Sequence, residues 1–576
     1  MKNFKSEAIA LVGGGPAALL MMKNILDQKL MPETIYIFEK NDRLGVGMPY
    51  GKFGSGVEHV ANVSANELPK FSCSFEDFLA LNPFTEFPDF LQNGKFNPYQ
   101  VIPRILLGNY MEYQFNLYIK LAKKCGIKVV VLKGCFVTDI IPMEDGDKFT
   151  IVTAAHKKYI VHHAVLCTGH HWPKTHEDKV EGWYDSPYPP AKFKNNTNYE
   201  VAIRGTSLTA VDAVKTLSRL NGKYEQQKTG ALKYILNENS KSFRIDLFST
   251  GGFLPALRFH SEDEAYSNEW MMTLEEIYEY KDKHNGFVDL DYVFEINFKL
   301  PLKKKDPKFY GQISELNIEA FVDKMMDIRK ELDSFQLFKS EYNEAEKSIK
   351  RRQSIGWKET LSAFSYAMNY PAKHFSAEDM LRLRKTLLPL ISIIIASLPQ
   401  SSYKEIIALY DAGIIDLIQV NKESFVVPHS ETGGTYHFEA PNKEKQMRYY
   451  KLFIDAVGQQ PLELSDLPFD GLKSNEFVSS AYLQFKSNSS AMKVSEIQDN
   501  AVFKGHNDNY YIKVNGLEIN DNFQSLGKYG QVIPNLFIMA VPFIGGLNPD
   551  YSGLDFCDTA AGRIVKTFKQ TIFGNI

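Results

Sequence analysis

The segment IALVGGGPAALLMM constrains the fold of this 576-residue chain more than any other. A short apolar run leads into Gly13-x-Gly15-x-x-Ala18, and a helical pattern continues beyond it. Gly13 permits a tight turn, Gly15 lets the backbone approach a pyrophosphate, and Ala18 keeps helix and strand close. Free N–H groups at the start of the helix would face the anion. The spacing therefore predicts a strand over 8–12, a turn, and a helix over 17–26.

An export signal and an ordinary strand–helix–strand unit are the alternatives for this segment. Lys2 and Lys5 precede the apolar run, as in a signal peptide, but no small-residue cleavage site is evident. The next strand, 34–40, contains Glu39, which lies 24 residues after Gly15. An acid near this place binds ribose in dinucleotide-binding units. We therefore expect dinucleotide binding rather than a surface acid on a plain strand.

The stretch YEVAIRGTSLTAVDAVKTL repeats the pattern later in the chain. Its turn reads Gly205-x-Ser207-x-x-Ala210, so a serine stands where the first turn has its second glycine. Close approach of this backbone to a phosphate is less assured. A strand over 243–252 completes a second unit, and a second dinucleotide site is expected. Asp212, inside the helix, is expected to face solvent or to cap.

Two further strands end in a similar way. The segments 159–173 (YIVHHAVLCTGHHWP) and 451–461 (KLFIDAVGQQP) each run from an apolar strand through a glycine into a polar loop. Such strand ends are typical of crossings between two nucleotide-binding domains. His170 and His171 are neighbours, and neighbours on an extended chain point to opposite sides. No metal site is therefore expected, while contact of one histidine with cofactor or substrate stays open.

The composition argues against several other classes of protein. A net charge of −3 gives no electrostatic case for a nucleic-acid partner. The five cysteines include no Cys-x-x-Cys pair, which disfavours a disulfide framework or zinc site and suits a cytoplasmic location. The apolar run 386–399 contains Pro389 and is shorter than the roughly 20 residues that span a bilayer. We expect a buried helix there and no membrane contact.

Together these features resemble the two-dinucleotide-binding flavoproteins, and more narrowly the FAD–NAD(P)-binding family, relatives of the flavin-dependent amine N-hydroxylases. Both glycine turns, Glu39 and the two crossings carry the resemblance. So do the segments RLGVGMPYG (43–51), HVANVSANEL (59–68), IPRILLGNYMEY (102–113) and GGLNPDYSGLDFCDTAAGRIV (545–565). The last of these resembles a flavin-capping loop and helix. The implied fold is α/β, with two Rossmann-like dinucleotide-binding domains, for FAD and NAD(P), and a mostly helical insertion.

The resemblance implies a set of cofactor contacts but no metal ligand. The expected contacts are Gly13, Gly15, Pro16, Ala17, Glu39, Lys40, Gly47, His59, Asn62, Arg104, Val137, Thr168, Gly169, Gly205, Ser207, Leu208, Thr209, Asn548, Ser552, Gly553 and Leu554. Asn548 and Ser552 to Leu554 would face the isoalloxazine. No catalytic side chain is predicted, and His59 is expected to be a structural histidine more readily than a base.

The activity that the resemblance implies is an FAD-dependent oxidoreductase reduced by NADPH or NADH. As an N-hydroxylase-like monooxygenase, it would use O2 to oxygenate a small amine or amino-acid-like substrate. The oxygenating species would be a flavin C4a-hydroperoxide in a water-poor pocket. A reductase or dehydrogenase without oxygenation is an alternative, as is a flavin-binding scaffold that has lost nicotinamide chemistry. The sequence leaves open whether the protein forms a homo-oligomer.

Two departures from the family pattern bear on the nicotinamide. The basic pair after the second strand is replaced by Thr250 and Gly251. A planar guanidinium is the best partner for the 2′-phosphate that distinguishes NADPH from NADH. Without the basic pair, either Arg204 or Arg258 binds this phosphate or the enzyme uses NADH. Ser207, which replaces the second glycine of the turn, is the other departure. It leaves open the alternative that nicotinamide binding is weak or lost.

The expected domain division follows from these signals. Residues 1–195 and 430–576 would form the FAD-binding domain, and 196–260 with 400–430 the NAD(P)-binding domain. The stretch 261–400 has helical periodicity and no nucleotide signal. We expect it to be an insertion that either covers the active site as a lid or supplies an oligomer contact.

Overall fold

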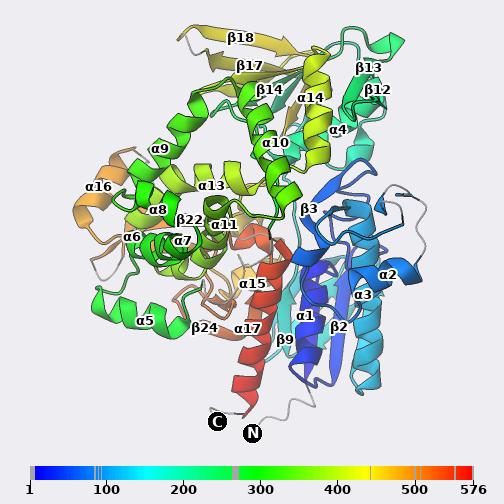
Figure 1. Ribbon diagram of the computed structural model, residues 1–576. Coiled ribbons are helices and arrows are strands. Elements are labelled where there is room, and N and C mark those ends of the chain that lie inside the picture. Colours follow the sequence, from blue (N-terminus) through cyan, green and yellow to red (C-terminus); the bar gives the residue numbers. More distant parts are fainter. Residues whose placement is uncertain are drawn as a thin grey trace.

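The computed structural model describes residues 7–82, 86–87, 90–91, 94–261, 271–440, 443–497, 501–505, 508–549 and 553–573. Two α/β units lie one above the other, with a helical region at their side (Figure 1). The late helix α17 runs beside α1, from the beginning of the chain, so the first unit is built from both ends of the sequence (Figure 1).

The first unit is a six-stranded sheet in the order β23-β24-β9-β1-β2-β5. All neighbours pair in parallel except β23 with β24. The strands are β1 (Ala8–Val12), β2 (Thr34–Glu39), β5 (Lys128–Lys133), β9 (His163–Leu166), β23 (Gln524–Leu526) and β24 (Val532–Ile538). Helix α1 (Pro16–Asp27) packs against α3 (Arg104–Lys124) and α17 (Gly553–Phe573). The apolar runs of β1 and β2 are buried, as expected for a parallel sheet covered on both faces.

The second unit is a parallel five-stranded sheet in the order β10-β19-β11-β14-β15. Its strands are β10 (Trp183–Tyr184), β11 (Glu200–Arg204), β14 (Arg244–Ser249), β15 (Ile415–Gln419) and β19 (Leu452–Asp455). Its helices are α4 (Leu208–Asn221) and α14 (Gln400–Asp411), and a hairpin joins β12 (Gly222–Gln226) to β13 (Leu232–Leu236). An antiparallel sheet of β16 (Phe425–Pro428), β17 (Gly434–Glu439) and β18 (Lys445–Tyr450) covers one face. There the rings of Phe248 and Tyr436 stack at 3.8 Å between centroids.

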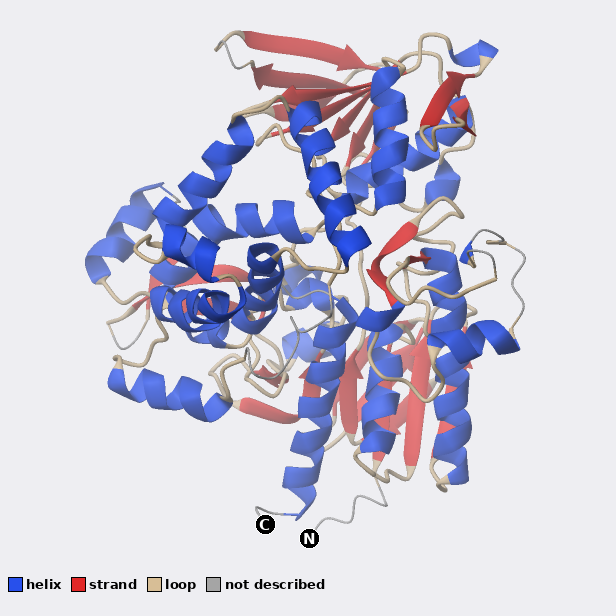
Figure 2. Ribbon diagram, in the orientation of Figure 1, coloured by secondary structure: helices blue, strands red, loops and turns tan. Residues whose placement is uncertain are grey.

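The region between β14 and α14 is helical (Figure 2). Its helices are α5 (Leu274–Lys283), α6 (Leu290–Phe294), α7 (Leu300–Lys305), α8 (Pro307–Ile313), α9 (Ile318–Lys330), α10 (Ser334–Arg351), α11 (Gly356–Met368), α12 (Ala377–Arg382) and α13 (Leu388–Ile395). Most of its apolar side chains share one core with the first unit. Phe335 and Phe338 of α10 belong to the core of the second unit. The helical region therefore fastens both units together.

Smaller elements complete the first unit and its edge. They are α2 (Phe75–Leu81), α15 (Asp470–Ser474), α16 (Asn488–Ile497), β3 (Val60–Ser64), β4 (Val101–Pro103), β6 (Val137–Pro142), β7 (Phe149–Thr153), β8 (Lys158–Val161), β20 (Ser480–Gln484), β21 (Val502–Lys504) and β22 (Tyr510–Leu517). Among the described helices, none is both long enough and apolar enough to cross a membrane.

The structure confirms the expected fold class, two parallel α/β units with a helical insertion, but its strand pairing differs from the expected division at 430–455. Strand β19 pairs with β10 and β11, so it lies in the second sheet rather than in the first. The apolar pattern of a buried strand does not reveal its neighbour, because the partners are far away in sequence. We propose that the second unit comprises residues 183–260 and 399–455.

Candidate functional site

The first glycine turn joins β1 to α1 in a conformation that favours glycine. Gly13 has a φ of +107°, and its N–H donates to the Phe38 carbonyl at 2.9 Å. A Cβ at Gly13 would lie 2.5 Å from the Cys167 carbonyl oxygen, so the turn has no room for a side chain. Thr168 and Gly169 follow Cys167 directly, which brings the first crossing against this turn.

The N-terminus of α1 is open toward an anion. Gly15 is the N-cap and offers no side-chain hydrogen bond, Pro16 stands in the first turn, and no acidic residue follows there. The N–H groups of the first turn, that of Ala17 among them, have no acceptor inside the helix. Gly47 approaches so closely that a Cβ on it would lie 2.9 Å from Pro16 Cδ. This cradle, bare of side chains, fits a pyrophosphate.

Glu39 stands beside the turn at the end of β2. It is 6% exposed, and its two carboxylate oxygens accept the Gly14 N–H at 2.9 Å and the Asn41 N–H at 2.7 Å. A carboxylate with one such bond to each oxygen keeps acceptor capacity for ribose hydroxyls.

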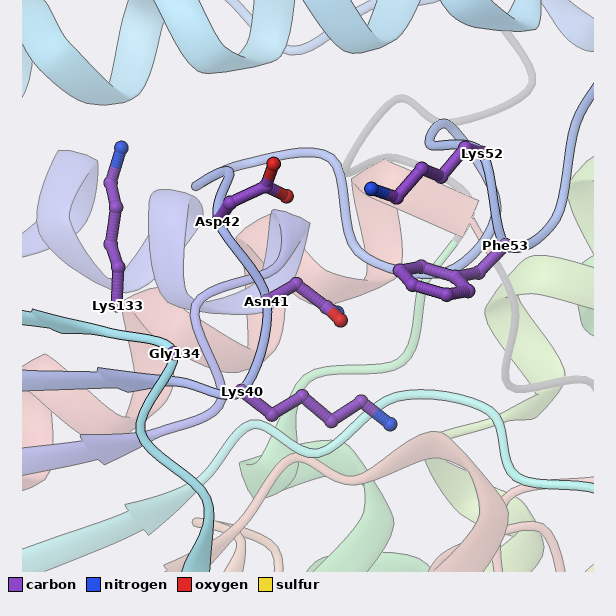
Figure 3. Close-up of a pocket in the computed structure, with 7 residues that line it drawn as sticks. All are labelled: Lys40, Asn41, Asp42, Lys52, Phe53, Lys133 and Gly134. Carbon is purple, nitrogen blue, oxygen red and sulfur yellow. The ribbon is translucent and has the colours of Figure 1, made fainter.

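A pocket of about 510 Å³ is lined in part by the residues that follow Glu39 in the chain, Lys40 to Asp42 (Figure 3). It is lined by Lys40, Asn41, Asp42, Lys52, Phe53, Lys133 and Gly134. The side chains of Asn41 and Phe53 point toward one another across it (Figure 3). The buried Val137 begins β6 close by in the chain. An aromatic ring and hydrogen-bonding groups at this place suit the adenosine end of a dinucleotide.

The second glycine turn repeats the backbone of the first. Gly205 has a φ of +111°, its N–H donates to the Phe248 carbonyl at 2.8 Å, and a Cβ on it would lie 2.7 Å from the Ala456 carbonyl oxygen. Ser207 is the N-cap of α4 and makes no side-chain cap bond. Leu208 and Thr209 then begin the helix. The serine therefore leaves the turn geometry intact.

The end of β14 lacks a counterpart of Glu39. Ser249 ends the strand and the exposed Thr250 follows it. The hydroxyl of Thr206 donates to the Phe253 carbonyl at 2.8 Å, so the chain folds back onto itself here.

The two arginines named as substitutes for the missing basic pair occupy different places. Arg204 ends β11, next to β14, and pairs with Asp455 at 3.2 Å. Arg258 pairs with Glu67 of the first unit at 2.6 Å and also donates to the Asn62 carbonyl at 2.9 Å. Arg204 is thus the nearer of the two to the end of β14.

A cavity of about 520 Å³ lies where the first unit, the start of α4 and the helical region meet. The first unit lines it with Met48, Pro49, Tyr50, Gly54, Ala61, Asn62, Val63, Glu67, Arg104, Gly553, Leu554 and Asp555. The crossing loops and the second unit add His170, Trp172, Tyr188, Leu208, Thr209 and Gln459. A third wall consists of Arg258, Phe259, Ser261, Lys358, Glu359, Ser362, Tyr366, Ile394, Ile395 and Ser397. Six of the residues expected from the sequence therefore meet here: Asn62, Arg104, Leu208, Thr209, Gly553 and Leu554.

Gln459 joins the two crossings. Its Oε1 lies 2.7 Å from His170 Nδ1, and its amide nitrogen donates to the His171 carbonyl at 2.7 Å. Burial lowers the pKa of His170, so the imidazole is neutral and Nδ1 carries the proton given to Gln459. No cluster of three or more His, Cys, Asp or Glu that could hold a metal occurs within the described ranges.

His59 and Arg104 meet Asp212 of the second unit. Arg104 Nη1 lies 2.5 Å from the Asp212 carboxylate, and His59 Nε2 lies 3.2 Å from the Asp212 carbonyl. Asp212 is only 5% exposed and is not a cap, so the expectation of a solvent-facing or capping acid is wrong. The helix pattern alone did not show that a second unit covers this face. Contact of His59 or Arg104 with a cofactor stays a prediction.

The C-terminal loop is attached to the helical region. Asn548 is fully buried and its amide donates to the Asn369 carbonyl at 2.7 Å. Asn548 does not line the cavity, whereas Gly553 and Leu554, at the start of α17, do. Ser552 lies outside the described residues. The predicted contacts of this loop with a flavin stay predictions.

Helix α11 supplies the polar part of the third wall, through Lys358, Glu359, Ser362 and Tyr366. The Glu359 carboxylate pairs with Lys305 and accepts the Ser261 hydroxyl at 3.1 Å. Lys358 pairs with Glu344 at 2.8 Å. This wall is therefore polar while its buried charges are compensated. The sequence did not lead us to predict this wall. Its one indication was the pair of charged residues, Lys358 and Glu359, in an otherwise apolar helix.

These features define the class of protein. Residues 10–171 match the family model described as FAD-NAD(P)-binding, which covers the first turn, Glu39 and the first crossing. The chain thus carries an FAD-NAD(P)-binding domain, and the resemblance found in the sequence is confirmed.

The nearer relatives follow from two further matches. Residues 273–395 match the YdhS-like middle domain. The Escherichia coli (strain K12) protein YdhS is 26% identical over 472 residues, which is 81% of this chain and 85% of that protein.

Among solved structures, the chain is similar to ornithine hydroxylase (PvdA) from Pseudomonas aeruginosa. The identity is 12%, the TM-score 0.49, and the match covers 98% of this chain and 99% of the other. The bacillithiol disulfide reductase Bdr (YpdA) from Bacillus cereus is similar at 12% identity and a TM-score of 0.41, again over 98% and 99%. These two proteins have different reactions, and neither assigns one to this chain.

Proposed function

We propose that this protein is an NAD(P)H-dependent FAD monooxygenase that oxygenates a small amine or amino-acid-like substrate. The observation that carries the proposal is the cavity of about 520 Å³ that side chains of the first unit and the start of α4 line together. The second turn's helix start reaches it through Leu208 and Thr209, and the first unit reaches it through Asn62 and Leu554. A flavin held by the first unit and a nicotinamide held by the second would therefore meet there.

The first unit has the features that FAD requires. The turn from Gly13 to Ala17, covered by Gly47, suits the pyrophosphate, because it offers helix N–H groups and no side chain. Glu39 suits the ribose. We propose that Lys40 and Val137 contact the adenosine end, and that Thr168 with Gly169 lies along the pyrophosphate. When bound, the flavin would accept a hydride from the nicotinamide and pass the electrons to O2.

The chain's own part is to orient both rings and to limit stray protons. Burial raises the pKa of Tyr50 to about 12, so its phenol stays protonated at neutral pH. Burial also raises the pKa of Tyr188, whose hydroxyl donates to Asp212 at 2.6 Å. The neutral His170 gives its one ring proton to Gln459. Donors that are weakly acidic, such as Tyr50, or already hydrogen-bonded, such as Tyr188 and His170, favour oxygen transfer over wasteful discharge.

We infer that the substrate lies against the third wall, formed by α11 and the segment after β14. This wall offers the hydroxyl group of Ser362 beside compensated charges. Such a surface suits a small polar molecule, because it holds both hydrogen-bonding groups and apolar side chains such as Ile394.

The test begins with the absorbance spectrum of the purified protein before and after anaerobic NADH or NADPH. Bleaching of a flavin band by either nucleotide is the expected result, followed by oxygen uptake that yields a hydroxylated amine. A flavin that neither nucleotide reduces would sink the proposal. Reduction followed only by hydrogen peroxide, with every amine and amino acid supplied, would make the protein a reductase.

A further inference from the structure

The face of α4 that carries Asp212, Lys215 and Thr216 is attached to the first unit. These three positions share one side of the helix, because residues three and four apart are neighbours there. Lys215 donates to the Glu58 carbonyl at 3.3 Å, and the Thr216 hydroxyl donates to the Glu58 carboxylate at 2.7 Å. The start of the same helix, Ser207 to Thr209, is where we propose that the second turn binds a phosphate. Any movement of this face therefore moves that site relative to the first unit.

Asp212 is the centre of the attachment. Its carboxylate lies 2.5 Å from Arg104 Nη1 and 2.6 Å from the Tyr188 hydroxyl. Arg104 begins α3 and also donates through Nε to the Val60 carbonyl at 3.1 Å. Tyr188 follows β10, at the beginning of the second unit. Two segments, one from each unit, thus meet α4 at one carboxylate.

The backbone of Asp212 takes part as well. His59 Nδ1 accepts the Gly56 N–H at 2.8 Å, so the ring proton is on Nε2, which donates to the Asp212 carbonyl at 3.2 Å. The side chains of Asp212 and Arg104 are only 6% and 14% exposed. Solvent therefore screens this ion pair weakly, and a lost partner would leave a charge buried.

We propose that Asp212 is a positioning residue, which with Arg104 and Tyr188 sets the approach of the nicotinamide unit to the flavin unit. The proposal rests on the proposed function only for its kinetic consequence. Hydride transfer demands reacting atoms at near-contact distance, and a misplacement of 1 Å can cost about 100-fold in rate. The attachment of α4 would thus govern the rate of flavin reduction, although the ion pair lies a turn away from the anion site.

The decisive variant is D212N, which keeps the shape of the side chain and loses its charge. With FAD bound, we expect the limiting rate of flavin reduction by NADH or NADPH to fall at least about tenfold. The nucleotide concentration at half-saturation should stay within about threefold, because the anion site itself is unchanged. R104K, which keeps the cation, should recover part of the rate lost in R104M.

The chain offers a closely matched control. Asp246 of β14 is also a partly buried aspartate with an arginine and a tyrosine hydroxyl, Arg448 at 3.6 Å and Tyr450 at 2.5 Å. These partners all belong to the second unit. D246N should therefore leave the limiting rate within about twofold of wild type.

A second readout does not depend on turnover. Amide hydrogen exchange of the FAD-loaded protein without nicotinamide should rise in D212N over segments 56–60 and 208–217, and should not rise there in D246N. An unchanged limiting rate in D212N, an equal loss in D246N, or unchanged exchange in both segments would overturn the proposal. If wild-type flavin is not reduced at all, the proposed function fails, while the exchange data still decide whether Asp212 holds the two units together.

Discussion

The two glycine turns of this protein have nearly the same backbone and different surroundings. Gly13 and Gly205 have φ values of +107° and +111°, and each N–H bonds to the neighbouring parallel strand, β2 for Gly13 and β14 for Gly205. The N-caps Gly15 and Ser207 have φ, ψ of −82°, −162° and −77°, −171°. The serine in the second turn therefore changes a side chain and leaves the backbone geometry of the turn as it is.

The two turns differ at the end of the parallel strand beside each of them, which is β2 for the first turn and β14 for the second. In the first unit the Glu39 carboxylate accepts the Gly14 N–H, whereas in the second the Thr206 hydroxyl donates to the Phe253 carbonyl. The first turn thus has a buried carboxylate beside it, which we propose binds ribose, and the strand beside the second turn ends in Ser249 instead. The comparison teaches that the glycine spacing sets the backbone of both turns, while the parallel strand beside each turn supplies different side chains to the proposed nucleotide sites.

The largest effect is expected from Gly13→Ala. The new Cβ would lie 2.5 Å from the Cys167 carbonyl oxygen in a left-handed backbone conformation, and we expect a loss of about 3 kcal/mol or more in the free energy of unfolding. Urea unfolding and the flavin content of the purified protein measure the loss. Gly126→Ala is the control, because Gly126 also has a positive φ but open space around it. Equal stability of both variants would contradict the expectation.

Gly205→Ala should separate the two turns. A Cβ there would lie 2.7 Å from the Ala456 carbonyl oxygen, so the second turn distorts while the first is untouched. The variant should retain FAD and show at least about tenfold slower reduction by NADH and NADPH. Stopped-flow spectra at saturating nucleotide measure this, with Gly230→Ala, at an uncrowded positive φ, as the control. Loss of FAD together with reduction would show that the turns are not independent.

Glu39→Gln tests the acid that distinguishes the first turn. The carboxylate accepts two N–H groups, and an amide can accept only through its oxygen, so one donor loses its partner. Bonds to charged groups contribute about 1.5–3 kcal/mol, which predicts FAD binding weaker by tenfold or more. Titration of the flavin-free protein with FAD gives the affinity. An unchanged dissociation constant would mean that Glu39 serves the fold of the turn alone.

Thr250→Arg tests the missing basic group of the second unit. Thr250 is exposed just after β14, so we expect a guanidinium there to be tolerated and to reach the 2′-phosphate of NADPH bound at the proposed site. We expect the ratio of half-saturating NADH to NADPH to rise about tenfold, the value of a charge-assisted contact. Thr250→Gln has similar reach without charge and should leave the ratio unchanged. A wild-type protein that already prefers NADPH strongly would point to Arg204 as the existing partner.

The smallest effect is expected from His59, which contacts the Asp212 carbonyl where the two units meet. Burial lowers the pKa of His59, although Asp212 and Glu58 oppose this. The unfolded chain therefore binds a proton more readily than the folded one below about pH 6.5, so stability falls as the pH drops from there toward the folded pKa. The contribution is limited to about 1.4 kcal/mol per pH unit. Urea unfolding from pH 7 to 5 should show a shallower slope in His59→Gln, and an identical slope would remove His59 as a source.

Local patterns in the sequence were enough for the two turns. The strand over 8–12 is β1 as expected, and the helix over 17–26 is α1 with one residue more at each end. Both glycines need a positive φ that other residues rarely adopt, so their spacing carries three-dimensional information directly. The fold class followed from two such units and the helical periodicity between them.

The candidate site was predictable only in part. The sequence indicated Leu208, Thr209 and Leu554, which do meet at the cavity. It did not indicate Glu359 of α11, because helical periodicity reveals which face is buried but not what covers it. The same limit applied to Asp212, whose partner Arg104 is 108 residues away in the chain.

The sequence by itself determined the turns, the acid at the end of β2 and the helical nature of the middle region. Each of these depends on backbone preferences or on spacing within a few tens of residues. Only the tertiary structure decided that β19 belongs to the second sheet, that α11 forms a wall of the cavity, and that Asp212 holds α4 against α3. These depend on contacts between distant segments, which arise when whole surfaces pack, and no local pattern encodes the partner.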